Sequence, residues 1–248
     1  MERVFASPGN GPISAVYRLG NPYVNWYVVE SDGGLLIIDS GLAGHWRQLL
    51  QGLEALEKSV HDVAHLLLTH AHPDHVGLAE RMRRESNATV WIHALDADMA
   101  TTNQDRPPLA PLLSGLWQPA VAKMIVMMMR DGVMNAKPVR DVRTFRDGDR
   151  LPIPGSPTAV HTPGHTPGSC AFYFQQDRLL FSGDALVTFD LLRARKSAPM
   201  LPPGREKAAM IHSLDGLGPI GDERVVLLPG HGEPWAGKVG EAVAGACA

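Results

Sequence analysis

The feature that most constrains this chain is a turn with three histidines and one aspartate, Thr-His-Ala-His-Pro-Asp-His at residues 69–75. It directly follows the apolar run 63–68, which has the composition of a buried strand. In extended backbone, side chains two residues apart project to the same side, so His70 and His72 can point at one ion. We therefore expect the turn to stand at the end of a strand and to bind metal.

The second half of the turn supplies two further candidate ligands. Pro73 fixes the backbone, and Asp74 and His75 are predicted to open an amphipathic helix that runs to Arg84, because the first turn of a helix favours an acidic side chain. Imidazole nitrogens and carboxylate oxygens suit zinc, and also iron or manganese, better than calcium or magnesium. The alternative is a polar loop whose histidines only form hydrogen bonds.

The composition favours one domain over residues 1–248, because the chain is 44% hydrophobic and 20% charged and has no low-complexity tract. A formal net charge of -3 disfavours a nucleic-acid partner, since such proteins usually carry a basic face. No run has the length of a membrane span or the pattern of a secretory signal, and Cys170 and Cys247 offer no disulfide framework. We expect a cytoplasmic protein without a membrane partner.

Periodicity and turn residues predict alternating strands and helices. In the first part of the chain the expected elements are strands at 13–19, 23–30 and 35–39, a helix at 45–58 and strands at 63–68 and 89–93. In the second part they are strands at 141–146, 149–153, 158–161, 169–174 and 178–182, a helix at about 205–217, a strand at 224–228 and a short tail beyond Trp235. The order strand, helix, strand around residues 63–93 implies a parallel crossover, and the whole series implies two sheets packed face to face with helices outside.

Residues 94–138 differ in character and are expected to form a helical insertion. Prolines at 107, 108, 111 and 119 interrupt the segment, and residues 120–129 are apolar except for Lys123. A helix that is apolar on all faces must be covered on all faces, so this one is core, a lid over the active site or a contact in a homodimer. Five methionines between Met124 and Met134 suit plain packing or an adaptable wall for an apolar substrate.

Three later strand ends carry further candidate ligands. His165 lies between two Pro-Gly pairs, Asp184 follows a strand through Gly183, and His231 stands among glycines after the last predicted strand. Each residue alone is a weak signal, because a histidine or aspartate after a strand is most often a cap or turn residue. Their co-occurrence with the turn 69–75 is a strong one.

The series resembles the pattern of the metallo-β-lactamase superfamily over nearly the whole chain. The resemblance implies an α/β fold, a four-layer αβ/βα sandwich with a two-metal site at one sheet edge. The ligands that the resemblance implies are His70, His72 and His165 for one metal, Asp74, His75 and His231 for the other, and Asp184 as the bridge between them.

The implied function is that of a dinuclear zinc hydrolase, in which a metal-bridging hydroxide attacks a small ester, thioester or lactone. Two divalent ions are only partly neutralised by Asp74, Asp184 and the hydroxide, so a net positive charge remains to stabilise an oxyanion. Metal-bound water loses its proton near neutral pH, which makes the hydroxide available under cellular conditions. Asp74 and Asp184 are the predicted catalytic residues, and Asp74 is the candidate to carry a proton to the leaving group.

Departures from known branches leave the small-molecule substrate open. Zinc β-lactamases of the best-known kind carry a cysteine among the second metal's ligands, where this chain has Asp184. The chain is similar to glyoxalase II in the turn 69–75 and the Phe-Ser-Gly-Asp strand end, but those proteins continue with a helical glutathione-binding domain. It is similar to acyl-homoserine lactonases in the Thr-Pro-Gly-His-Thr-Pro-Gly loop, but their tyrosine shortly after the bridging aspartate is replaced by Val187.

Other polar residues fit either a role at the site or an ordinary structural one. Tyr23 and Trp26 suit substrate contact or core packing, and Asp39 suits a cap or a carboxylate that orients a ligating histidine. The basic side chains that suit a carboxylate or phosphate at the cleft mouth, or a solvated loop, are Arg193, Arg195 and Lys196.

Two other functions remain open. One is an oxidoreductase resembling persulfide dioxygenases, with a single iron held by His70, His165 and Asp184 and open positions for oxygen. The other is a non-catalytic metal-binding member of the fold. Metal analysis separates the first from the hydrolase, since about one iron per chain favours oxygen chemistry and about two zinc ions favour hydrolysis.

Overall fold

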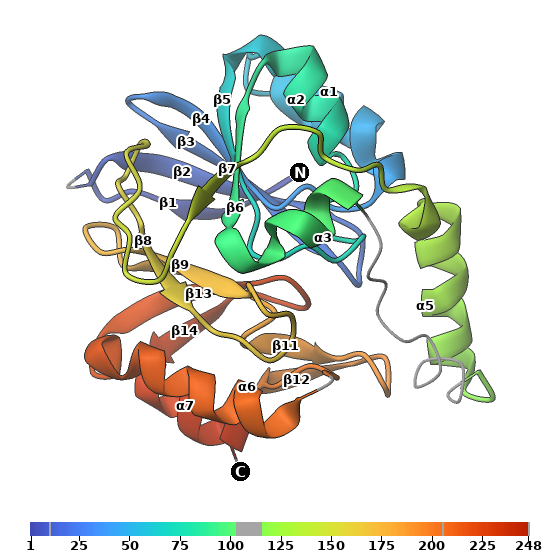
Figure 1. Cartoon of the computed structure of the whole chain (residues 1–248), viewed down its shortest axis with the longest axis vertical. Helices are drawn as coiled ribbons and strands as arrows, with labels where there is room; N and C mark the ends of the chain where they lie inside the picture. Colours follow the sequence, from blue (N-terminus) through green and yellow to red (C-terminus); the bar gives the residue numbers. More distant parts are fainter. Residues whose placement is uncertain (10, 103–115, 205, 248) are drawn as a thin grey trace.

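Two β-sheets packed face to face form the centre of the molecule, with helices on both outer faces (Figure 1). The computed structural model describes residues 1–9, 11–102, 116–204 and 206–247. The predicted four-layer sandwich is confirmed.

The first sheet has the strand order β1-β2-β3-β4-β5-β6-β7. Its first four strands pair antiparallel, and the strands from β4 to β7 pair parallel. The strands are β1 (Glu2–Ala6), β2 (Ile13–Gly20), β3 (Asn25–Ser31), β4 (Gly34–Ile38), β5 (Val63–Leu67), β6 (Thr89–His93) and β7 (Arg143–Phe145). The parallel pairing of β5 and β6 confirms the predicted crossover.

The second sheet has the order β14-β13-β10-β9-β8, in which only β10 and β13 pair parallel. Its strands are β8 (Thr158–His161), β9 (Cys170–Phe174), β10 (Leu179–Gly183), β13 (Arg224–Pro229) and β14 (Trp235–Lys238). A separate antiparallel hairpin consists of β11 (Val187–Asp190) and β12 (Arg195–Met200).

Each sheet buries its outer face under helices. The helices α1 (Trp46–Glu54) and α2 (Ala79–Ser86) place Leu49, Leu53 and Met82 against the first sheet. The helices α6 (Lys207–Ser213) and α7 (Val239–Cys247), with the 3-10 helix η5 (Leu214–Ile220), cover the second sheet. The other described 3-10 helices are η1 (Ala43–His45), η2 (Val60–Asp62), η3 (Ala94–Asp96) and η4 (Val133–Asn135). None of the described helices has the length and hydrophobicity needed to cross a bilayer.

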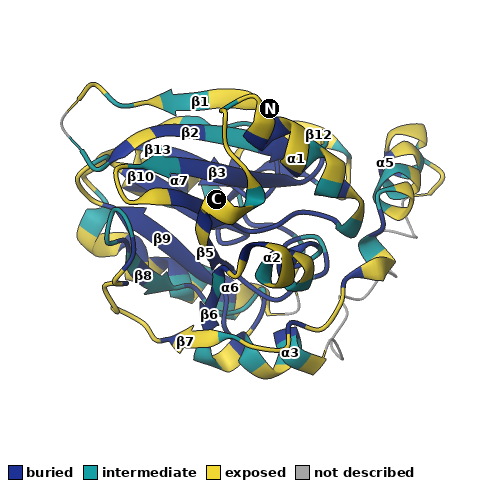
Figure 2. Cartoon of the chain, turned by 90° about the horizontal axis from the view of Figure 1, so that it is seen from above, coloured by how far each residue is buried: buried dark blue, intermediate teal, exposed yellow. Residues whose placement is uncertain are grey.

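The core between the sheets is rich in aromatic residues. Phe172, Phe174 and Phe181 of the second sheet pack there against Tyr27 and Trp91 of the first. Burying a large aromatic side chain contributes on the order of 2–3 kcal/mol, so this layer is a major source of stability. Figure 2 shows the buried central strands and the more exposed edge strands β1 and β7.

The helical insertion is described at its two ends, by α3 (Ala97–Thr102) and α5 (Pro119–Arg130), and the prolines at 107, 108 and 111 lie outside the described residues. The helix α5 stands at the side of the molecule and packs Val121 and Met124 against Tyr23 (Figure 1). Its outer face is not covered within the described chain, since Val126 is 67% and Met129 54% exposed. That the insertion forms a homodimer contact stays a prediction.

The helix predicted to open at Asp74 begins only at Ala79, so that prediction is wrong by about one turn. The intervening residues form a tight turn that passes close to the backbone after β4. A Cβ on Gly77 would lie 2.3 Å from the carbonyl oxygen of Gly41. This close approach, rather than helix propensity, sets the path of the chain here.

Other element predictions also differ from the structure. Residues 149–153 form a bend and one isolated bridge, from Arg150 to Thr158, in place of a strand. The helix predicted over 205–217 is shorter, because the chain tightens into η5 after Ser213. The tail beyond Trp235 is a strand and a helix, and β1, β11 and β12 were not predicted at all.

Candidate metal centre

The structure brings all seven predicted ligands together, where the carboxyl ends of strands from both sheets meet. Potential ligand atoms lie within 4.8 Å of one another in three overlapping groups. The groups are His70, His72 and His165; His70, His75 and Asp184; and Asp74, His75 and His231.

Strand pairing explains why residues so distant in sequence meet. The parallel strands β10 and β13 end side by side, with Gly183 opposite Pro229, so Asp184 and His231 leave the same sheet edge. The loop of His165 joins β8 to β9, and the first residue of β9, Cys170, donates its N–H to the carbonyl of Thr69 at 3.0 Å. That bond ties the second sheet to the histidine turn of the first.

Asp184 lies at the centre of the cluster. Its Oδ2 is 3.2 Å from Nε2 of both His165 and His231, and its Oδ1 is 3.6 Å from Nε2 of His75. One carboxylate therefore faces three imidazoles that come from both sheets.

The remaining ligands complete both sides of the cluster. His70 and His72 approach through Nε2 and Nδ1, which lie 3.1 Å apart. Asp74 Oδ2 is 3.6 Å from His231 Nε2 and 3.9 Å from His75 Nε2.

Asp39, for which the sequence left two roles open, orients a candidate ligand. Its buried carboxylate lies 2.8 Å from His75 Nδ1 and accepts hydrogen bonds from the backbone N–H and hydroxyl of Thr69. The ring of His75 is thereby held with Nε2 toward Asp74 and Asp184.

The loop of His231 is held by residues around the start of β3. His231 Nδ1 hydrogen-bonds to the carbonyl of Tyr23, which leaves Nε2 facing Asp184. The Asn25 amide donates to the carbonyls of Pro229 and Gly232. Sequence reasoning missed Asn25, and the only signal was an amide at the beginning of an otherwise apolar strand.

Asp96 is a second residue that sequence reasoning missed. Its carboxylate accepts from the N–H of Ala71 at 3.0 Å, the hydroxyl of Thr166 at 2.7 Å and the N–H of Gly168 at 2.6 Å. It thus connects the loop of His70 and His72 to the loop of His165. Burial raises the pKa of this carboxyl, and the three hydrogen bonds oppose that rise.

The electrostatics of the cluster favour positive charge. Burial acts against a charged His75, but Asp39, Asp74 and Asp184 outweigh it and raise the pKa of His75 to about 10. Asp184 is likewise buried, yet the neighbouring histidines hold its pKa well below the usual value. His70 shows the opposite direction, because burial and the adjacent histidines lower its pKa.

The residues present fit a bound metal. The atoms His75 Nε2, His165 Nε2 and Asp184 Oδ1 are buried, face the cluster and have no hydrogen-bond partner among the residues that the structure describes. A buried polar group without a partner costs on the order of 1–3 kcal/mol, and metal coordination would remove that cost at each of the three. The donor set of imidazole and carboxylate suits a divalent transition metal.

Comparison with known proteins places this chain in a family. A profile of the metallo-beta-lactamase superfamily matches residues 19–231. The chain belongs to the metallo-β-lactamase superfamily. The probable metallo-hydrolase YflN of Bacillus subtilis is 31% identical over 70% of this chain and 66% of its own length.

Two further comparisons show how far the likeness extends. The hydroxyacylglutathione hydrolase GloC of Haemophilus influenzae is 27% identical over 82% of each chain. The crystal structure of the metallo-beta-lactamase family protein TTHA1429 from Thermus thermophilus superposes with a TM-score of 0.65 at 24% identity, covering 93% of this chain and 77% of that one. The second likeness shows the shared superfamily fold.

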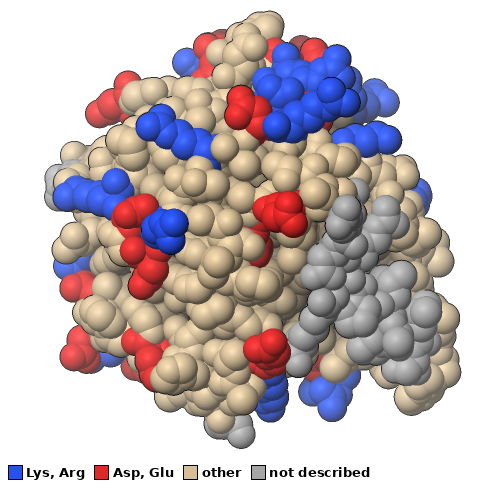
Figure 3. Space-filling view, in the orientation of Figure 1, with Lys and Arg blue, Asp and Glu red and all other residues tan. Residues whose placement is uncertain are grey.

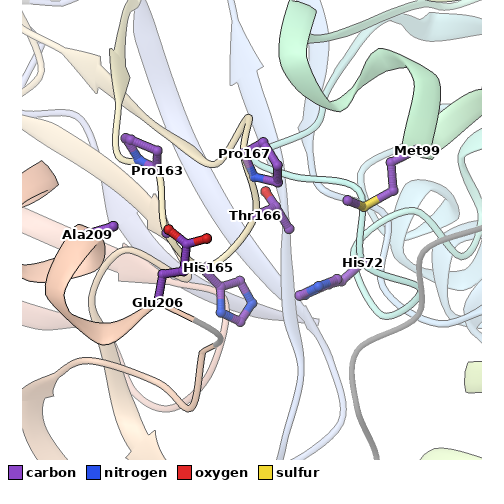
Figure 4. Close-up of a pocket in the computed structure, with 9 residues that line it drawn as sticks. His72, Met99, Pro163, His165, Thr166, Pro167, Glu206 and Ala209 are labelled. Carbon is purple, nitrogen blue, oxygen red and sulfur yellow. The ribbon is translucent and has the colours of Figure 1, made fainter.

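A pocket of about 240 Å³ opens beside the cluster of candidate ligands, next to His72 and His165 (Figure 4). It is smaller than the roughly 300–1,000 Å³ of sites for drug-sized ligands, so it suits one end of a small substrate. Its other lining residues are Met99, Pro163, Gly164, Thr166, Pro167, Glu206 and Ala209.

The other residues that the sequence suggested for substrate contact pack in the core or lie near acidic side chains. Trp26 is fully buried in the core, and the ring of Tyr23 packs edge-on against Phe189 with centroids 5.7 Å apart. The basic side chains all lie near acidic ones: Arg193 and Arg195 near Asp190 at 2.9 and 3.8 Å, and Lys196 near Glu233 at 3.2 Å.

Proposed function

We propose that this protein is a dinuclear zinc hydrolase acting on a small ester, thioester or lactone. One observation carries the proposal: seven imidazole and carboxylate side chains converge, and buried atoms of three of them, His75, His165 and Asp184, have no hydrogen-bond partner among the described residues. The names of two relatives, a probable metallo-hydrolase and a hydroxyacylglutathione hydrolase, support a hydrolytic reaction.

The arrangement of the donors supports two adjacent metal positions. His70, His72 and His165 would hold one ion, Asp74, His75 and His231 the other, and Asp184 would contact both. When bound, two divalent ions polarise a carbonyl and supply hydroxide at neutral pH.

The protein's own residues prepare this chemistry by fixing the imidazole rings. Asp39 and the carbonyl of Tyr23 each engage the Nδ1 atom of a histidine, so that the Nε2 atoms of His75 and His231 face inward. Pre-oriented ligands need no rearrangement when substrate binds, which lowers the cost of reaching the transition state.

Asp74 and Asp184 differ in their exposure to solvent, which suggests different roles. The side chain of Asp184 is 3% exposed and that of Asp74 is 14% exposed. Asp74 is thus the carboxylate that can reach both the reacting group and solvent, and it would carry the proton to the leaving group.

The proposal is tested by metal analysis together with a panel of esters, thioesters and lactones. We expect about two zinc ions per purified chain and hydrolysis of at least one substrate class, with a loss of at least about 100-fold in Asp184→Asn. The matched control is Asp222→Asn, because Asp222 is fully exposed and its carboxylate pairs with Lys238 rather than with a candidate ligand. Equal activity in the wild type and Asp184→Asn contradicts the proposal.

The same metal analysis separates the other candidate functions. About one iron per chain with oxygen consumption would establish the oxidoreductase instead. Bound metal with no turnover of any substrate would establish a non-catalytic member of the fold. The proposed location is the cytoplasm, supported by two free thiols, Cys170 and Cys247.

A further inference from the structure

One carboxylate lines the substrate pocket without being a candidate ligand. Glu206 lies at the beginning of α6, and Figure 4 shows its carboxylate directed toward the loop of His165. Apart from the histidines, it is the only ionisable side chain among the described residues that line this pocket.

The packing of α6 fixes the position of Glu206. Its carbonyl accepts the N–H of Met210 at 2.9 Å in the first turn of the helix. Met210 in turn packs against the loop of His165, since a Cβ on Gly164 would lie 2.6 Å from both the backbone nitrogen and the side chain of Met210. The start of α6 and the loop therefore form one wall, and Glu206 extends from it.

No lysine or arginine is among the described residues that line the pocket. The sequence suggested three basic residues for the cleft mouth. Each lies near an acidic side chain: Arg193 and Arg195 near Asp190, and Lys196 near Glu233. On the face drawn in Figure 3, Lys and Arg gather over α1 and α2, whereas the surface over α3 shows acidic and uncharged atoms. The helix α3 supplies Met99 to the pocket.

The rest of the lining is apolar or uncharged, and it includes Met99, Pro163, Pro167 and Ala209. Such a wall suits a group with a hydrocarbon surface. A quaternary or substituted ammonium group has a hydrocarbon surface together with a positive charge, which a nearby carboxylate stabilises. An anionic group would instead face Glu206 directly.

We propose that this pocket selects substrates with a cationic group close to the scissile bond, and that Glu206 is the residue that sets this preference. The inference rests on the proposed hydrolase function and names its substrate class: small cationic esters, thioesters or lactones rather than anionic ones. Because Glu206 is exposed, we expect its electrostatic effect to be that of a surface pair, a preference of about fivefold.

The test compares three acetate esters of similar size that differ in charge. Acetylcholine is cationic, 3,3-dimethylbutyl acetate is its neutral isostere, and 3-carboxypropyl acetate is anionic. We expect kcat/KM of the zinc-loaded wild type to fall in that order. Glu206→Gln should erase the difference between the first two esters, Glu206→Lys should invert the order, and added salt should weaken the wild-type preference.

The matched control is Glu85→Gln, which removes an equal charge from the outer helix α2. It should keep the wild-type order. Equal turnover of the three esters by the wild type overturns the inference and leaves the hydrolase proposal standing. A uniform loss on all three esters in Glu206→Gln also overturns it, because that result would assign Glu206 to catalysis rather than to charge selection.

A binding measurement keeps the inference testable even if no ester is hydrolysed. Calorimetry on the metal-free protein compares choline with 3,3-dimethylbutanol, which has the same shape without the charge. We expect choline to bind about fivefold more tightly to the wild type and equally to Glu206→Gln. Equal binding of both alcohols by the wild type contradicts the inference independently of turnover.

Discussion

At the scale of single residues, the metal centre depends on carboxylates that are not themselves candidate ligands. Asp39 lies 2.8 Å from one imidazole, and Asp96 holds two loops that carry three others. Both are buried, and both act by accepting hydrogen bonds from backbone and hydroxyl groups. The orientation of the candidate ligands is therefore fixed by residues that are not themselves candidate ligands.

Asp96 is expected to be a positioning residue for the ligands His72 and His165. In Asp96→Asn an amide group replaces one acceptor oxygen, so either Gly168 or the pair Ala71 and Thr166 loses a hydrogen bond. We expect urea unfolding to show a loss of about 1–3 kcal/mol. Zinc affinity, measured by competition with a chelator where the variant is fully folded, should fall about tenfold or more.

The control for Asp96 is Asp98→Asn, which removes the same charge two residues later in α3. It should change stability by no more than about 0.5 kcal/mol and leave zinc affinity unaltered. If Asp96→Asn loses stability but binds zinc as the wild type does, its role is structural only.

His93 gives the stability of this protein a pH dependence of predictable sign. Burial and the stacked ring of His161, 4.3 Å away, lower the pKa of His93 to about 4, while Asp147, Asp149 and Arg146 contribute smaller effects. In the unfolded chain the pKa returns to about 6.5, so the unfolded state binds the proton first as pH falls. The contribution of His93 to the free energy of unfolding should therefore decline from pH ~7 toward pH ~4.

The test of this sign is urea unfolding of the metal-free protein at several pH values. His93→Phe keeps an aromatic ring beside Phe145 and His161, and we expect a shallower decline with acid than in the wild type. The side chain of His212 is 88% exposed, so His212→Gln should decline in parallel with the wild type. A parallel decline in His93→Phe would show that its proton is not linked to folding.

At the scale of elements, the helical insertion is connected to a candidate ligand by a chain of hydrogen bonds. Asp131 ends α5 and accepts the side-chain N–H of Asn21 at 2.9 Å. The side-chain oxygen Oδ1 of Asn21 accepts the backbone N–H groups of Tyr23 and Val24, and the backbone carbonyl of Tyr23 hydrogen-bonds to His231 Nδ1. The position of α5 and the orientation of His231 are therefore coupled.

The coupling predicts the outcome of a double-mutant cycle. Asn21→Ala and Asp131→Ala should each destabilise the protein by about 1 kcal/mol, with an interaction energy of about 0.5–1.5 kcal/mol between them. Both should also weaken zinc binding, because the turn that orients His231 loses its anchor. The neighbouring Arg130 has an 84% exposed side chain, so Arg130→Ala serves as the control. Purely additive effects of the two changes would exclude the coupling.

Features of the fold could be predicted from the sequence where they depend on residues that are close together in the chain. The histidine turn, the crossover and the core strands depend on neighbouring residues, and all three were predicted. The hairpin β11–β12 was missed because its charged residues, Arg195 and Lys196 among them, indicate a solvated loop. Asp96 was missed because its partners lie 25, 70 and 72 positions away, and only the folded chain brings them together.

At the scale of the whole molecule, the centre joins the two sheets. The first sheet contributes the ligands from His70 to His75, and the second contributes His165, Asp184 and His231. Bound metal would therefore act as a link across the sandwich, in addition to any role in catalysis. Ions that bind only the folded protein raise its stability by mass action.

Metal removal is expected to lower the melting temperature of the whole molecule. Free zinc at about 100 times its dissociation constant stabilises by about 2.7 kcal/mol for each site, and a protein of this size shifts by about 2–4 °C per kcal/mol. Chelation should thus lower Tm by about 5–10 °C for each site that it empties, and added zinc should restore it. Asp184→Asn should respond far less than the wild type, since the residue between the two halves has lost its charge, and Asp222→Asn should respond as the wild type does. A protein that loses all its metal to the chelator yet melts at an unchanged temperature would show that the sandwich is held by its cores alone.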